Sequence, residues 1–237
     1  MPSIKTLCRN VVAPLMEAYG FLRCSIGNGR FLESYYRQIN DVLQVLTFLK
    51  RGKSYSFAFN IYPLSLGITD LDVDDCDIAW YRGEWSEWIK KNRPWECWNY
   101  RTAQRQWWAE EELIDTNFDE PVQLIRQYVI PLFEKGCNAK TAYEQITEYE
   151  RTVFTHIIMH NSSYALLCLQ AEDYENSERH MAAICKMCRQ DVYEECNQKL
   201  KMIQNRDTES LHRFLEEGTK KTLDFLESIK PKRRSKK

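Results

Sequence analysis

Hydrophobic positions at the start of the chain recur every three or four residues. This spacing over residues 4–18 predicts an amphipathic helix, with Pro14 late in it. Ser3 can cap the first turn, and Gly20 can end the helix. The chain therefore opens with a helix that buries one face.

The spacing then changes to alternation, which is typical of strands. Residues 54–62 alternate aromatic and small polar side chains, whereas residues 41–50 are mostly apolar, so we expect that run to be buried on both faces. The turns Asn40-Asp41 and 51–53 are short, which predicts an antiparallel meander. The predicted strands are 30–37, 41–50 and 54–62, and Leu66–Thr69 could form a fourth.

Helical spacing returns after these strands. Residues 80–108 indicate helical pieces broken at Gly83 and Pro94. A longer helix follows, with Asp119 as its cap and Gly136 as its stop. Beyond it only helices are predicted, over residues 143–158, 164–171, 181–203 and 211–229, and Pro231 ends the last of them.

These patterns predict an α+β fold. Residues 1–137 are expected to form an N-terminal antiparallel β-meander packed with helices. Residues 138–230 are expected to form an all-α helical bundle or a tetratricopeptide-like helical hairpin region. Residues 231–237 are expected to be a basic disordered tail, since residues 230–237 read KPKRRSKK.

Composition narrows the class of protein. Hydrophobic residues make up 43% of the 237 positions, enough for a core, and the net charge of −1 produces no overall field that attracts nucleic acid. We find no signal-peptide pattern and no apolar run of the ~18 residues that a membrane span needs. The nine cysteines are odd in number and scattered, which argues against a disulfide framework. A cytoplasmic location away from the membrane is expected.

Several motifs occur in a fixed order between residues 7 and 137. They are PLMEAYGFLR (14–23), YYRQINDVLQVLTFLK (35–50), SFAFNIYPLSLG (56–67) and QLIRQYVIPLFEKG (123–136). In this order the stretch resembles a small bacterial family, the domain of unknown function 4304 family. The resemblance implies a fold and a bacterial cytoplasmic setting. It provides no catalytic residues, and it does not extend into residues 138–237.

All seven tryptophans lie between Trp80 and Trp108, interleaved with arginines. Trp with Arg is the composition of interface hot spots, and it also suits single-stranded nucleic acid, whose bases stack on aromatic rings. A hydrophobic cover for the sheet is the third alternative. Neighbouring glutamates disfavour nucleic acid, because phosphate contacts need net positive charge. The candidate binding residues are Trp85, Trp88, Trp95, Trp98, Arg82, Arg101 and Arg105.

Residues in two parts of the sequence could bind a metal ion. DLDVDDCD (70–77) begins like a calcium loop but has Asp75 where the sharp turn needs Gly. His156 and His160 have the i, i+4 spacing of a metal pair without the glutamate of metalloproteases. A charged loop and a polar helix edge are the alternatives. The candidate ligands are Asp70, Asp72, Asp74, His156 and His160.

Cys185 and Cys188 form a single CxxC, which lies mid-helix in the predicted helix 181–203. A structural zinc site needs a second such pair, so we expect buried thiols that act as small hydrophobes.

The sequence favours a non-enzymatic protein-binding module that uses the Trp/Arg surface, and an immunity-type role against a basic toxin fits that surface. The alternatives are a single-stranded nucleic-acid accessory protein and a metal-dependent hydrolase. No catalytic residue and no cofactor are predicted. The partner and the oligomeric state stay open.

Overall fold

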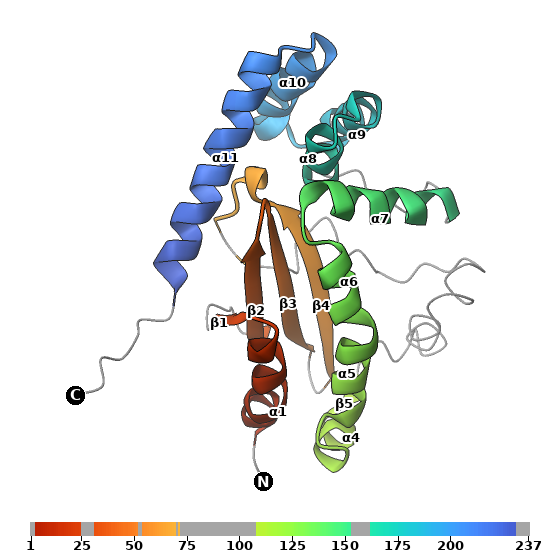
Figure 1. Ribbon diagram of the computed structural model, residues 1–237, viewed down its shortest axis with the longest axis vertical. Coiled ribbons are helices and arrows are strands. Elements are labelled where there is room, and N and C mark those ends of the chain that lie inside the picture. Colours follow the sequence, from red (N-terminus) through yellow and green to blue (C-terminus); the bar gives the residue numbers. More distant parts are fainter. Residues whose placement is uncertain are drawn as a thin grey trace.

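The computed structural model describes residues 3–24, 31–51, 54–69, 71, 108–152 and 162–230. The α+β class is confirmed: one antiparallel sheet is followed by a helical region (Figure 1). The sheet has the order β1 (Leu22–Cys24), β2 (Phe31–Ile39), β3 (Val42–Arg51), β4 (Ser54–Pro63) and β5 (Trp108–Ala109). The helical elements are α1 (Ile4–Ala18), η1 (Leu64–Leu66), α4 (Glu110–Asp115), α5 (Asp119–Leu124), η2 (Ile125–Val129), α6 (Ile130–Lys135), α7 (Ala139–Thr152), α8 (Ser162–Gln170), α9 (Tyr174–Met187), α10 (Gln190–Gln204) and α11 (Thr208–Ile229).

Helix α1 forms where the apolar spacing predicts it. The Ser3 hydroxyl accepts a hydrogen bond from the Thr6 backbone N–H at 3.2 Å, which satisfies one of the free donors of the first turn. Pro14 lies on the exposed side of the helix. Gly20 adopts a φ of 79°, a left-handed conformation that suits glycine, and turns the chain toward β1.

The predicted meander of β2, β3 and β4 is confirmed. Ile39 pairs with Val42 across a tight turn in which Asn40 has a φ of 49°, a value that asparagine tolerates. Every residue of β3 from Val42 to Phe48 is buried, as expected for a strand covered on both faces. The short strands β1 and β5 and helix α4 are not predicted by the sequence. The suggested strand at Leu66–Thr69 is wrong, because η1 ends there and Gly67 turns the chain with a φ of 73°.

The two faces of the sheet are covered by different parts of the chain. On one face, Tyr35, Leu46 and Phe59 pack in a cluster that includes residues of α1, α5 and α6. On the other face, Tyr36 and Val45 lie in a cluster with residues of α11. Figure 1 shows α11 and α5–α6 on opposite sides of the sheet. The last helix of the chain thus completes the core of the first strands.

Helix α8 connects the helical region to the sheet. Tyr164, Leu167 and Cys168 belong to the same cluster as the sheet residues on the α1 face, although they lie beyond residue 137. The opposite side of α8 packs in a cluster with Met181 of α9. The Ser177 hydroxyl donates to the Ala165 carbonyl at 2.8 Å, so small residues lie where α8 and α9 cross. Contacts therefore cross the boundary that the sequence predicts between 137 and 138.

Two of the predicted helices are not single α-helices. The helix expected at 181–203 is wrong as one element, because Cys188 and Arg189 are extended, with ψ of 156° and 155°, and separate α9 from α10. Asp119 is the first helical residue rather than the cap, and Phe118 holds the cap position. A π-helical turn, η2, interrupts the same segment just before Pro131. Pro131 has no backbone N–H to donate to the previous turn, which accounts for the altered hydrogen-bond pattern of this helical segment.

Helix α11 is attached to η1 by a close backbone approach and two hydrogen bonds. The Thr222 hydroxyl donates to the Leu64 carbonyl at 2.6 Å and accepts from the Ile68 backbone N–H at 2.8 Å. Gly218 lies directly against Ser65, with no space for a β-carbon. Thr222 is fully buried, so its hydroxyl is the hydrogen-bond partner of two backbone groups that water does not reach.

We expect Thr222→Val to lower the free energy of unfolding by about 2 kcal/mol, because the change keeps the shape but leaves a buried N–H and a buried carbonyl unpaired. Urea unfolding followed by circular dichroism measures this loss. Thr219→Val is the matched control: the Thr219 hydroxyl donates to the Leu215 carbonyl in its own helix. Equal losses for the two variants would contradict the assigned role of Thr222.

Candidate functional site

The residues chosen from the sequence lie outside the described residues. This holds for the binding-surface candidates Trp85, Trp88, Trp95, Trp98, Arg82, Arg101 and Arg105, and for the metal candidates Asp70, Asp72, Asp74, His156 and His160. Within the ranges that the structure describes, no group of three or more His, Cys, Asp or Glu is placed to hold a metal ion. None of the described helices has the length and apolarity that would let it cross a membrane.

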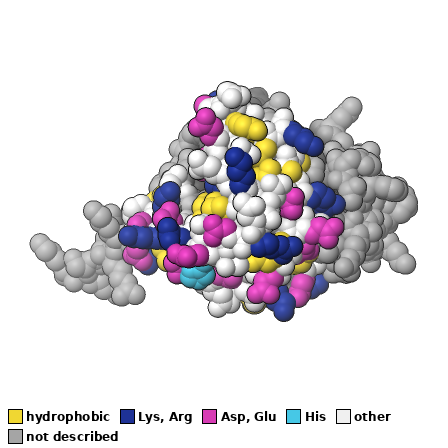
Figure 2. Space-filling view, turned by 90° about the horizontal axis from the view of Figure 1, so that it is seen from above, with side chains coloured by type: hydrophobic (Ala, Val, Ile, Leu, Met, Phe, Trp, Pro, Cys, Tyr) yellow, Lys and Arg dark blue, Asp and Glu magenta, His cyan; other side chains and the backbone are white. Residues whose placement is uncertain are grey.

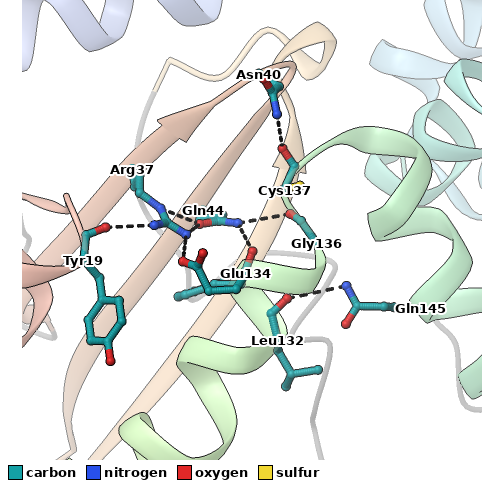
Figure 3. Close-up of polar contacts among 10 residues, drawn as sticks. Tyr19, Arg37, Asn40, Gln44, Leu132, Glu134, Gly136, Cys137 and Gln145 are labelled. Carbon is teal, nitrogen blue, oxygen red and sulfur yellow. Dashed lines mark hydrogen bonds and ion pairs between the residues drawn. The ribbon is translucent and has the colours of Figure 1, made fainter.

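Three of the polar clusters among the described residues are candidates for a functional site, and the first is centred on Arg37 (Figure 3). Its guanidinium donates to the Gln44 side-chain oxygen at 2.7 and 2.9 Å, to Glu134 at 2.7 Å and to the Tyr19 carbonyl at 2.8 Å. The same group lies 4.7 Å from the centre of the Phe21 ring. The Arg37 side chain is 13% exposed, so its charge depends on these partners rather than on water.

Gln44 connects this arginine to the end of α6. Its amide nitrogen donates to the carbonyls of Phe133 at 2.6 Å and Gly136 at 3.0 Å. The last carbonyls of a helix have no partner within the helix, so the strand side chain supplies one. Arg37 also places its positive charge near the negative end of the α6 dipole.

The turn between β2 and β3 continues this contact into α7. The Asn40 amide donates to the Cys137 carbonyl at 2.9 Å, and the Asp41 carboxylate accepts from the Ala139 backbone N–H at 2.9 Å. Arg37 and Gln44 lie in the same motif, residues 35–50, and pair across the hairpin of β2 and β3. The first cluster holds the junction of α6 and α7 against the sheet.

The second cluster surrounds Glu33 on the α1 face of β2. The side chain of Glu33 is 1% exposed and forms a salt bridge with Arg9. Lys5 and Arg23 approach its two oxygens at 4.0 and 3.9 Å. Among the described residues, the Glu33 Oε2 atom has no hydrogen-bond partner. One buried carboxylate therefore faces three partly exposed cations, which leaves a net positive patch beside β1.

Cys8 and Tyr35 also lie in this cluster. Their Sγ and hydroxyl atoms are 3.9 Å apart. Burial raises the pKa of the Cys8 thiol to about 12 and also raises the pKa of the Tyr35 hydroxyl. Both groups stay protonated at neutral pH, so neither is poised as a nucleophile. The sequence gives one signal for this cluster, which is the acidic Glu33 between the hydrophobic residues Phe31 and Leu32 and the tyrosines Tyr35 and Tyr36 of β2.

The third cluster consists of the thiols of Cys185, Cys188 and Cys196. The Cys188 Sγ atom donates to the Cys185 carbonyl at 3.6 Å, and Cys188 is close enough to Cys196 to interact with its thiol. Burial, together with the neighbouring thiols, raises the pKa of Cys185 and of Cys196. All three cysteines are partly exposed, so the expectation of buried mid-helix thiols is wrong for this CxxC. Cys188 is the C-cap of α9, and Cys196 joins the pair from α10.

His180 of α9 is buried. Its ring packs edge-on against Tyr164, with the ring centres 4.3 Å apart, and its Nε2 atom lies 3.2 Å from the Arg179 guanidinium. These contacts give the imidazole a packing role.

Comparison of the chain with protein-family models, with curated proteins and with solved structures finds no match. The resemblance to the domain of unknown function 4304 family therefore stays a prediction from the sequence.

Proposed function

We propose that the protein is a non-enzymatic protein-binding module whose contact surface includes residues 80–108. The observation that carries this proposal is the concentration of all seven tryptophans, with interleaved arginines, in 29 consecutive residues. Trp and Arg dominate interface hot spots because they combine a large contact area with hydrogen bonding or charge. Acidic residues 70–77 precede the segment and favour a partner with a basic surface, as an immunity-type role against a basic toxin would require.

The contacts of the polar clusters also support a binding role. The donors of Arg37 and Gln44 are directed at backbone carbonyls and side chains that hold helices on the sheet. Cys8 and Tyr35 are buried and stay protonated. These groups have fold-maintaining contacts, so a binding role requires no chemistry from them.

The charge pattern favours a protein over a nucleic acid as the partner. On the face formed by the helical end of the molecule, basic and acidic side chains are interspersed (Figure 2). A mixture of this kind does not create the single-sign field that attracts phosphate chains. The nucleic-acid alternative relies on the same Trp/Arg segment and on the basic tail, and the patch of Lys5, Arg9 and Arg23 would add positive charge to it.

The first test is the tryptophan emission of the native protein and its quenching by acrylamide. All of the signal comes from residues 80–108. A binding surface predicts red-shifted emission and ready quenching, close to that of the urea-unfolded protein, because several indoles would face water. Blue-shifted emission with weak quenching would contradict the proposal.

The second test compares partner capture by matched variants. Alanine at Trp85, Trp88 and Arg101 is expected to abolish capture of the partner while the circular dichroism spectrum stays unchanged. Tyr193→Ala is the control, because Tyr193 is an exposed aromatic residue of α10, far from the segment in sequence. Capture that survives the three substitutions would overturn the proposal. Single-stranded DNA binding at ~50 mM salt, weakened steeply by added salt, would support the nucleic-acid alternative instead.

A further inference from the structure

We propose that Cys185, Cys188 and Cys196 form an oxidisable thiol site, in which a hydroperoxide joins Cys188 and Cys196 by a disulfide bond. The site lies at the turn between α9 and α10 and is independent of the proposed partner surface. Its ligand class is a small peroxide that reaches partly exposed sulfur atoms.

The turn between the two helices brings these thiols together. Cys185 lies in the last turn of α9, and the extended residues Cys188 and Arg189 reverse the chain into α10. Cys196 then comes back alongside, two turns into α10. The Cys188 thiol contacts the Cys185 carbonyl at 3.6 Å and interacts with the Cys196 thiol. Cys188 is therefore the central sulfur of the cluster.

The three sulfur atoms are not needed for packing. Met181, Ile184 and Leu200 carry the hydrophobic contacts of α9 and α10 in their shared cluster. The three cysteines are absent from that cluster and are partly exposed, whereas the described cysteines Cys8, Cys24 and Cys168 are buried. Partly exposed thiols are accessible to a small oxidant, whereas fully buried thiols are not.

The central position of Cys188 assigns the first step to it, because a sulfenic acid on Cys188 lies beside the Cys196 thiol that attacks it. Burial and neighbouring thiols raise the pKa of Cys185 and of Cys196, which disfavours the thiolate form of both. The Lys199 ammonium acts in the opposite direction on the pKa of Cys196, but burial is the larger effect. Cys196 is thus better suited to the second step, in which it attacks an already oxidised sulfur.

The reaction balances with hydrogen peroxide as the oxidant. Cys188 gives up its proton to water, and the thiolate attacks one peroxide oxygen. An S–O bond forms, the O–O bond breaks, and the leaving hydroxide is protonated to water. The Cys196 sulfur then attacks the resulting sulfenic acid of Cys188. An S–S bond forms, the S–O bond breaks, and the hydroxyl leaves as water with the Cys196 proton, so that two electrons pass from sulfur to the peroxide.

The sequence allows the product to be mapped without ambiguity. Trypsin places the three cysteines in three different peptides, 180–186, 187–189 and 190–199. The full-length reduced protein is treated with graded hydrogen peroxide, the remaining thiols are alkylated, and the digest is analysed by mass spectrometry. We expect peptides 187–189 and 190–199 to be linked, at least about tenfold more than either peptide is linked to peptide 136–140, which carries Cys137.

Variants distinguish this site from general oxidation. Cys196→Ser should abolish the linked product and leave a sulfenic acid on Cys188, which a dimedone reagent labels. Cys137→Ser is the matched control, because Cys137 is also partly exposed and should leave the linkage unchanged. Circular dichroism verifies that each variant is folded. Linkage of peptides 187–189 and 190–199 no more abundant than linkage to the Cys137 peptide, or a main product that links Cys185 to Cys188, would overturn the proposal.

Discussion

Replacing Gln44 by leucine is expected to lower the free energy of unfolding by about 3–5 kcal/mol. Gln44 is fully buried and takes part in four hydrogen bonds, two accepted from Arg37 and two donated to the end of α6. Leucine keeps a similar volume but leaves the Phe133 and Gly136 carbonyls unpaired. It also leaves a mostly buried guanidinium with fewer acceptors. Thermal and urea unfolding, monitored by circular dichroism, would measure the loss.

Gln38→Leu is the matched control for this prediction. Gln38 lies on β2, in the same hairpin, but its side chain is exposed. Its replacement should change the free energy of unfolding by no more than about 0.5 kcal/mol. A Gln44→Leu variant as stable as the Gln38→Leu variant would show that the network does not hold α6 against the sheet.

The second large effect is expected at Gly218. A β-carbon there would lie 2.0 Å from the Ser65 carbonyl oxygen and 2.7 Å from its carbon, both of which are backbone atoms. Alanine normally stabilises a helix interior relative to glycine by about 1 kcal/mol. Here the clash must push α11 away from η1, so Gly218→Ala should instead lower the free energy of unfolding by at least about 2 kcal/mol.

A local measurement separates this displacement from a general loss of stability. The Ile68 backbone N–H donates to the Thr222 hydroxyl, so its hydrogen exchange should become faster in Gly218→Ala as α11 moves away. Glu217→Ala is the control, because it places alanine at the neighbouring exposed position of the same helix. Unchanged exchange at Ile68 together with wild-type stability would contradict the close packing of α11 on η1.

Local patterns were sufficient for the elements that are long and regular. Helix α1 with its Ser3 cap and the meander of β2 to β4 follow from spacing and turn residues, because both depend on neighbours a few positions apart. Strands β1 and β5 have three and two residues, too few to show a period. The break at Cys188 and Arg189 contains neither glycine nor proline, so no local signal marks it.

The polar clusters were not predictable in the same way. Arg37 and Glu134 are 97 positions apart. Cys196 lies near Cys188 only because the chain reverses between α9 and α10. The sequence candidates for binding, from Arg82 to Arg105, rest on composition alone and lie outside the described residues. They stay predictions that the fluorescence and capture experiments can decide.

The sequence by itself determined the α+β order of the elements, the burial of β3 on both faces and the amphipathic stripe of α1. These features depend on residue types at fixed local spacing. That spacing places apolar side chains on one face of a helix or strand, and the hydrophobic effect favours burial of that face. Only the tertiary structure decided that α11 covers the second face of the sheet and that Gln44 caps α6. It also decided that three thiols meet at one turn. The first two contacts join residues far apart in the chain, and their partners are selected by packing and by the need to pair buried polar groups. The third depends on the reversal of the chain between α9 and α10.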